Sequence, residues 1–335
     1  MNLTLSCIDA IYFCRLRLFY RAISSGKIGG FLGPEIRGSI GHQLKACMGC
    51  YGDQNEDCQL CPASKQNGCV YDWFYGPDTH QSKGMVLKFD HAFRGLKPEF
   101  DKGESLQCDI TLIGDNLKTA HSFLDALKQH NLRLGLHGLS FKLIEAGFVD
   151  ENGAFLPLNN SDEIKIIKLS SMQSRIEQTI SQHSRMELSL HTPTEIRLLR
   201  VSKKREFLQN PDDFTFRLFT ERMLGQIREI ASSHCQWLEN EKEGNSRYRT
   251  MIELSEKIPL VFHRGSWEMV GFRNKPGKKF GGLVGSFVYE GDFRPFGDLL
   301  YAAAQLGFGQ KTTSGFGQIS FRLLNDNEGL NFLRL

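Results

Sequence analysis

The 335-residue sequence has no run of 18 consecutive apolar residues, so a membrane-spanning helix is not expected. A secretion signal is not expected either, because Arg15 and Arg17 interrupt the apolar stretch near the N-terminus. A strong excess of one charge is also lacking, since the formal net charge is only +3 and selects no class of partner by itself. These absences predict a cytoplasmic chain, and its length fits two domains, each with its own core.

The glycine-rich stretch at 307–317 lacks the spacing of two familiar nucleotide-binding loops. A Walker A loop requires glycine directly before its lysine and another glycine five residues earlier, where this chain has Gln310 and Gln305. The Rossmann fingerprint requires a third glycine three residues after its second, where Thr312 and Ser320 stand. The sequence therefore predicts neither kind of loop.

What the stretch does offer is glycine pairs around one lysine and three hydroxyl side chains. Glycine permits positive φ and lets another chain approach the backbone amides closely. Such a loop suits a phosphate-rich ligand, and the alternative is a glycine-rich turn without a ligand. The candidate phosphate-binding residues are Gly307, Gly309, Lys311, Thr312, Thr313, Ser314, Gly315 and Gly317.

Basic residues outnumber acidic ones in the surrounding part of the chain. From Arg264 to Arg322 there are eight Lys or Arg against four Asp or Glu, interleaved with phenylalanines. This pattern fits a surface that faces a polyanion, and the alternative is a solvated basic face. The candidate contacts are Arg264, Arg273, Lys275, Lys278 and Lys279.

Five cysteines lie close together in the pattern C-x2-C-x7-C-x2-C-x7-C, within an insertion at 47–75. In a chain without an export signal, such a cluster favours a metal site over disulfides. Four thiolates are typical of tetrahedral zinc, and reduced cysteines packed in a loop are the alternative. A site closed by thiolates is structural, so no catalytic metal is expected. The cysteines that compete for the four positions are Cys47, Cys50, Cys58, Cys61 and Cys69.

Apolar patterning predicts the same order of elements twice. The first round consists of a strand at 8–23, a helix at 34–48, strands at 84–93 and 105–115, a helix at 116–131 and a strand at 132–149. The second consists of a strand at 185–199, a helix at 211–235, strands at 259–272 and 281–291, a helix at 298–306 and a strand at 318–323. This order is the split βαβ of a ferredoxin-like fold. The sequence thus predicts an α+β chain with tandem ferredoxin-like domains at 1–184 and 185–335.

The first predicted helix places a histidine and a lysine on its polar face. An apolar stripe from Ile36 to Cys47 faces the core. At about 100° per residue, His42 points roughly 170° away from that stripe, and Lys45 lies roughly 60° from His42. A catalytic pair is one interpretation, and two ordinary solvated side chains are the other.

Three strings resemble the RAMP superfamily of CRISPR-associated proteins. FLGPEIRGSIGHQLKAC (31–47) contains an RGxxGHxL-type motif, GESLQCDITLIGD (103–115) is similar to a later segment, and 278–321 closely resembles the C-terminal block. Within the superfamily the pattern is most similar to the endoribonuclease that processes precursor CRISPR RNA. The resemblance implies cleavage without a metal, in which a 2′-hydroxyl attacks the adjacent phosphate and leaves a 2′,3′-cyclic phosphate and a 5′-hydroxyl.

The resemblance also implies roles and partners. The family's catalytic histidine commonly lies on or just after the first helix, which makes His42 the first candidate. His263 is the second candidate, because it lies in a predicted strand beside Arg264, with further basic residues following. Lys45 is a candidate for stabilising charge, Lys311 for holding phosphate and Arg37 for contacting RNA. The implied partners are CRISPR repeat RNA, guide RNA and other CRISPR effector or adaptation proteins. The alternative is a RAMP subunit that binds guide RNA without cutting it.

Overall fold

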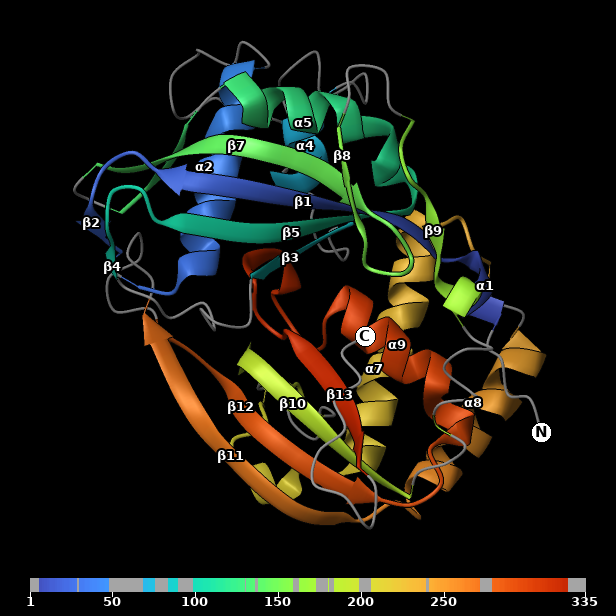
Figure 1. Cartoon of the computed structure of the whole chain (residues 1–335). Helices are drawn as coiled ribbons and strands as arrows, with labels where there is room; N and C mark the ends of the chain where they lie inside the picture. The colour runs from blue at the N-terminus through green and yellow to red at the C-terminus, as the bar shows by residue number, and fades with distance from the viewer. Residues whose placement is uncertain are drawn as a thin grey trace.

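The computed structural model describes residues 6–28, 30–47, 69–75, 84–89, 99–129, 131–135, 138–158, 163–172, 180, 184–198, 206–238, 241–271 and 279–324, without the side chains of 241–245, 271 and 279. Two main antiparallel sheets, one from each half of the chain, lie one above the other in Figure 1. A small two-stranded sheet is formed in addition by β2 (Gly26–Lys27) and β4 (Glu99–Phe100).

The first sheet has the strand order β3-β5-β1-β7-β6. The strands of this sheet and the helices between them are β1 (Tyr12–Ala22), α2 (Leu32–Cys47), α4 (Val70–Tyr75), β3 (Met85–Phe89), β5 (Ser105–Ile113), α5 (Ala120–Gln129), β6 (Leu132–Leu134), β7 (Leu139–Val149), β8 (Phe155–Pro157) and β9 (Ile167–Lys168). The helices α2, α4 and α5 cover one face of this sheet, where they share a buried apolar cluster with its strands (Figure 1).

The second sheet has the order β11-β12-β10-β13, with α7 and α9 packed on one face. Its elements are β10 (Arg185–Thr194), α7 (Phe216–His234), α8 (Glu241–Ser255), β11 (Leu260–Gly271), β12 (Lys279–Glu290), α9 (Gly297–Leu306) and β13 (Ile319–Leu324). In both sheets the first strand lies between the third and the fourth, and the second lies at an edge, as in a ferredoxin-like fold. The predicted tandem arrangement is confirmed.

The N-terminal strand is shorter than predicted, because residues before Tyr12 form the short helix α1 (Ser6–Ala10). Cys7 and Ile8 of this helix are buried in the apolar cluster of the second half of the chain. Val86 of β3 and Ile113 of β5 belong to the same cluster. Side chains of the first domain therefore pack in the same buried apolar cluster as those of the second domain.

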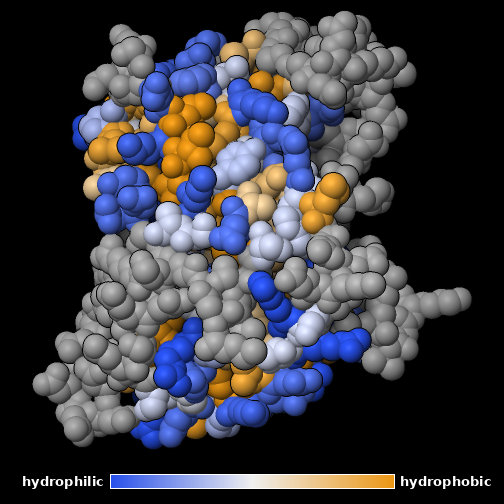
Figure 2. Space-filling view, turned by 90° about the vertical axis from the view of Figure 1, so that its right-hand side faces the viewer, coloured by the Kyte–Doolittle hydropathy of each residue, from blue (hydrophilic) through white to orange (hydrophobic). Residues whose placement is uncertain are grey.

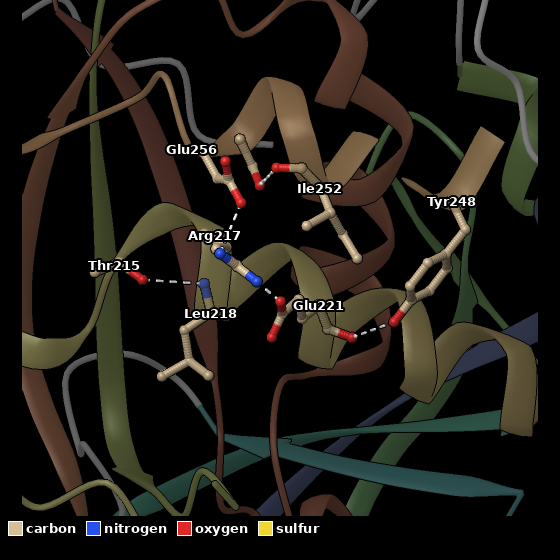
Figure 3. Close-up of polar contacts among 8 residues, drawn as sticks. Thr215, Arg217, Leu218, Glu221, Tyr248, Ile252 and Glu256 are labelled. Carbon is tan, nitrogen blue, oxygen red and sulfur yellow. Dashed lines mark hydrogen bonds and ion pairs between the residues drawn. The ribbon is translucent and has the colours of Figure 1, made fainter. Parts of the chain in front are cut away.

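The helix α8 packs against α7 and lies in a part of the chain where no helix was expected. Arg217 of α7 binds Glu221 at 2.9 Å and Glu256 at 2.6 Å, just beyond the end of α8 (Figure 3). The Tyr248 hydroxyl of α8 donates a hydrogen bond to the carbonyl oxygen of Glu221 at 3.4 Å (Figure 3). Thr215 caps the start of α7 by accepting from the Leu218 amide at 3.1 Å.

Some apolar side chains remain at the surface. On the side shown in Figure 2, apolar side chains gather in the upper half of the molecule among hydrophilic ones. Large exposed apolar residues of the first domain include Ile144 at 51% and Ile166 at 57%. Among the described helices, none is both long and apolar enough to cross a membrane.

Candidate functional site

A pocket of about 340 Å³ lies where the first domain meets the second. Its wall on the first domain includes Arg37, His42 and Lys45 of α2, and the second domain contributes Phe280 of β12 and Ser314. Ser314 belongs to the short 3₁₀ helix η6 (Thr312–Ser314) within the glycine-rich stretch. The volume is within the range of pockets that bind small ligands.

The α2 helix separates its polar and apolar faces largely as predicted. Ile36, Ile40 and Leu44 are buried against the core, whereas His42 is exposed at the pocket. The stripe ends one turn earlier than expected, because Cys47 at the end of the helix is exposed. The predicted pairing of a histidine and a lysine on one face is thus present in the structure.

Two tyrosines from α4 hold the cations of α2 against the pocket wall. Lys45 Nζ lies 4.7 Å from the Tyr71 ring centroid, and the Arg37 guanidinium lies 4.6 Å from that of Tyr75. The two rings stack on each other at 5.1 Å with an 8° angle between their planes. Cation–π contacts position a cation without neutralising it, so both charges remain available to an anion.

The Tyr75 hydroxyl locks this arrangement to the helix backbone. It donates a hydrogen bond to the carbonyl oxygen of Arg37 at 2.5 Å. Burial raises the pKa of Tyr75 above its usual value, which keeps the hydroxyl protonated as a donor. The ring packs over Gly41, where an added Cβ would lie 2.9 Å from a ring carbon. Sequence reasoning missed both tyrosines, and its only available signal was their spacing of four in VYDWFY.

The glycine-rich stretch forms a loop that touches α2 directly. Its four glycines all have positive φ, as the sequence analysis anticipated for this stretch. The backbone of its Ser314 approaches the first turn of α2 so closely that a Cβ on Gly33 would lie 1.9 Å from the Ser314 carbonyl oxygen. This contact brings the loop to the pocket.

The second domain fixes the start of the loop through side chains. Gln226 of α7 donates to the Gly307 carbonyl oxygen at 3.0 Å and accepts from the Gly309 amide at 3.1 Å. Lys311 pairs with Glu195 and lies 4.1 Å from the Phe280 ring centroid. The charge of Lys311, predicted to hold phosphate, is therefore already shared with a carboxylate. Thr312 and Thr313 are half-buried in η6.

The structure places His263 in β11, and it does not line the pocket. Its Nδ1 accepts from the Gly265 amide at 3.2 Å, so the proton is on Nε2, which donates to Asp212 at 2.7 Å. Its ring also stacks on Phe287 at 5.7 Å. Both ring nitrogens are thus used in local structure. Arg264, the next residue, is exposed.

Several predicted residues lie outside the described parts of the chain. They are Cys50, Cys58, Cys61, Arg273, Lys275 and Lys278, and the side chain of Lys279 is not described. Of the remaining cysteines of the cluster, Cys47 is exposed and Cys69 is buried just before α4. Within the described residues, no group of three or more His, Cys, Asp or Glu is placed to hold a metal ion. The zinc site stays a prediction.

Comparisons with known proteins give the same family for the second domain and the same fold for nearly the whole chain. Residues 188–319 match the family model of the CRISPR-associated endoribonuclease Cas6, and residues 11–171 match a model described as an N-terminal domain. Among curated proteins, none matches this sequence.

Solved structures resemble the chain in fold at low identity. A Cas6 product complex has a TM-score of 0.57 and 16% identity over 92% of this chain and 99% of the other. Thermus thermophilus Cas6 has a TM-score of 0.52 and 16% identity over 93% and 99%. A partial Cas6-RT-Cas1–Cas2 complex has a TM-score of 0.60 and 10% identity over 97% and 48%.

The resemblance seen in the sequence motifs is therefore confirmed by independent comparisons. The family match covers α9 and the glycine loop, and the shared fold covers nearly the whole chain, including α2. Residues 188–319 therefore match the family of CRISPR-associated Cas6 endoribonucleases, and nearly the whole chain shares the fold of solved Cas6 structures.

Proposed function

We propose that this protein cuts precursor CRISPR RNA within its repeats, without a catalytic metal, to give guide RNAs that end in a 2′,3′-cyclic phosphate. One observation carries the proposal: His42, Lys45 and Arg37 line a single pocket together with Ser314 of the glycine loop. This reaction requires a group that transfers a proton and cations that stabilise charge on the phosphate. The pocket offers a histidine and two cations beside the glycine loop.

In the proposed reaction, His42 accepts the proton of the 2′-hydroxyl next to the scissile phosphate. The 2′-oxygen forms a bond to phosphorus while the bond from phosphorus to the 5′-oxygen breaks. Lys45 and Arg37 stabilise the negative charge that develops on the phosphate oxygens, and the Lys45 ammonium is the candidate donor for the leaving 5′-oxygen. Because the nucleophile is the RNA's own hydroxyl, no metal-activated water is needed.

Two further roles belong to the same proposal. The clustered cysteines are proposed to bind one structural zinc, since thiolates are the ligands zinc prefers, and metal analysis of the purified protein checks the stoichiometry. The protein is also proposed to associate with other CRISPR proteins, because the fold is shared with the Cas6 part of a Cas6-RT-Cas1–Cas2 complex.

The deciding experiment uses end-labelled repeat RNA in EDTA with the wild-type protein and His42→Ala. We expect one cut with a cyclic phosphate end, and a loss of about 100-fold or more in rate for His42→Ala, as for removal of a proton-transfer group. His121→Ala is the matched control, because His121 is an exposed histidine on α5 and does not line the pocket.

The other outcomes separate the remaining interpretations. A cut that survives His42→Ala would keep the nuclease but move the histidine role, and His263→Ala would be the next variant. Tight binding of the RNA with no cut by the wild-type protein would contradict the proposal and favour a RAMP subunit that only binds guide RNA. A cut that requires added metal would contradict the mechanism.

A further inference from the structure

One short strand of the first domain lies against both ends of the glycine loop of the second. This strand is β3, and the loop runs from the end of α9 to the start of β13 (Figure 1). Lys88 and Phe89, consecutive residues at the end of β3, contact different ends of that loop. One strand of the first domain therefore contacts both Ala304, just before the loop, and Gly315, near the end of the loop.

Lys88 holds the end where the loop begins. Its ammonium donates a hydrogen bond to the carbonyl oxygen of Ala304, in the last turn of α9. The last carbonyls of a helix have no amide partner within the helix, and a cation there also interacts favourably with the helix dipole. Arg15 of β1 adds a bond from Nη1 to Oε1 of Gln305 at 3.3 Å. Lys88 thus caps α9 just before Gly307, and Arg15 holds a side chain of the last turn of the same helix.

Phe89 holds the end where the loop closes. Gly315 has φ of 74°, and an added Cβ would lie 2.3 Å from a carbon of the Phe89 ring, so the loop backbone rests directly on that ring. The Gln318 side-chain amide pairs with the backbone of Phe89, accepting from its N–H at 2.8 Å and donating to its carbonyl oxygen at 3.2 Å. β3 therefore clamps the loop on both sides.

The charges around Lys88 explain why its contact is directed at α9. Asp109, the residue of β5 opposite Lys88, accepts two hydrogen bonds of 2.8 and 2.9 Å from Arg17. Arg15 adds positive charge and Asp109 adds negative charge to the surroundings of the ammonium. Three cations thus surround one carboxylate, and the carbonyl oxygen of Ala304 supplies Lys88 with an acceptor from the other domain.

We propose that Lys88 is a positioning residue that fixes the glycine loop, through Ala304 and the end of α9, in the conformation that presents Ser314 to the pocket. Lys88 does not line the pocket. Its influence on RNA would be exerted through the loop alone. This role rests on the proposed function only for its effect on RNA, because the loop conformation itself can be measured without RNA.

The first test measures amide hydrogen exchange of the free protein at one pH. The Phe308 amide donates to Gly317, that of Gln310 to Glu195 and that of Ser314 to Lys311, so the loop has protected amides that report its order. In Lys88→Met we expect these amides to exchange about tenfold faster or more, as for loss of a hydrogen bond to a charged group. Amides in β5 should change little.

Two variants make this result specific. Lys142→Met removes an exposed lysine of β7 and should leave loop exchange unchanged. Lys88→Arg keeps a cationic donor and should restore slow exchange in part. Loop amides that exchange in Lys88→Met as in the wild type would overturn the proposal. So would an equal acceleration throughout the molecule, since that would show a general loss of stability.

The second test measures binding and cleavage separately. With repeat RNA that carries a 2′-deoxy group at the cut, Lys88→Met should bind about fivefold to tenfold more weakly, because ordering the loop then costs part of the binding free energy. The single-turnover rate at saturating uncut RNA should stay within about twofold. A changed rate with unchanged affinity would overturn the positioning role. Failure of the wild type to bind the RNA would contradict the proposed function. It would not affect the conclusion drawn from hydrogen exchange about Lys88 and the loop.

Discussion

The positive charge of Lys88 lowers the stability of the folded protein, because the ammonium is buried. Burial is the largest cause that lowers its pKa to about 7, Arg15 lowers it further, and Asp109 raises it. In the unfolded chain the pKa of a lysine is about 10.4. Below pH 7 both states carry the proton, so the cost of burying the charge is fully present. Between these two pKa values the unfolded chain holds more protons, and the free energy of unfolding therefore rises with pH.

This difference predicts how the wild type and Lys88→Met diverge with pH. Relative to Lys88→Met, the wild type should gain stability as pH rises from 7 toward 10, by up to about 1.4 kcal/mol per pH unit. Urea unfolding at several pH values measures this. Taking the difference between the two proteins removes contributions from other groups, such as the buried thiol of Cys14, whose pKa is raised to about 12. Parallel curves for the two proteins would contradict the prediction.

The positions of some side chains in the site can be predicted from the sequence, and those of others cannot. His42 and Lys45 follow from helical spacing, since both lie on one local element. The tyrosines that contact Lys45 and Arg37 were missed, because these contacts exist only when α4 packs on α2, and no local pattern predicts that packing. Lys311 was predicted as a phosphate ligand, and its pairing with Glu195 depends on a residue more than a hundred positions away.

Among the secondary-structure elements, α2 contains three glycines, and two of them differ in the space around an added Cβ. A Cβ on Gly33 would collide with the Ser314 backbone at 1.9 Å, whereas a Cβ on Gly38 has no neighbour within 4 Å. Gly33→Ala should lower the free energy of unfolding by about 1–3 kcal/mol, because backbone must move, and should lower the cleavage rate. Gly38→Ala should raise the free energy of unfolding by about 0.5–1 kcal/mol.

Thermal or urea unfolding of both variants provides the comparison. Gly38→Ala is matched to Gly33→Ala in helix and in chemical change, and only the Cβ at position 33 meets the Ser314 backbone. Its cleavage rate is not part of the control, since Gly38 itself lines the pocket. Equal stabilities for the two variants would show that Gly33 of α2 and Ser314 of the loop are not in close contact.

The order of elements was predictable, but their complete set was not. Alternating and helical periods gave both βαββαβ rounds, because each strand or helix has one apolar face. The α8 helix was missed although Tyr248, Met251 and Ile252 share helical spacing, since its first half is polar and glycine-containing. Its attachment through Arg217 and Glu256 joins residues that no local pattern connects (Figure 3).

Across the two domains together, a small aromatic cluster seals the junction beside the pocket. Phe31 before α2 packs edge-on against Phe316 of the loop at 4.6 Å, and Val270 completes the buried group. Phe280, which lines the pocket, packs on Phe316 at 6.4 Å. The sequence gives no period or motif for such a contact between domains, so the facing of the two sheets was not predicted.

Phe316→Ala should therefore weaken the junction as well as the fold. Removing a buried phenylalanine costs about 3–5 kcal/mol. Phe100→Ala is the control, because Phe100 is equally buried but packs on Phe141 within the first domain. At a temperature where both variants stay folded, only Phe316→Ala should lose most of its RNA cleavage. Equal losses of cleavage in the two variants would contradict a special role for the junction.

The clamp on the glycine loop also bears on when the protein becomes active during its synthesis. Phe89 and Gly33 precede the loop by more than two hundred residues, and Gln226 of α7 precedes it by about eighty. Domains generally fold as they emerge from the ribosome, N-terminal ones first. The helix with His42 can thus form early, while its pocket waits for the last strand and helix. A growing chain carries the histidine but no assembled site, so RNA near the ribosome meets the complete pocket only after the second domain has docked.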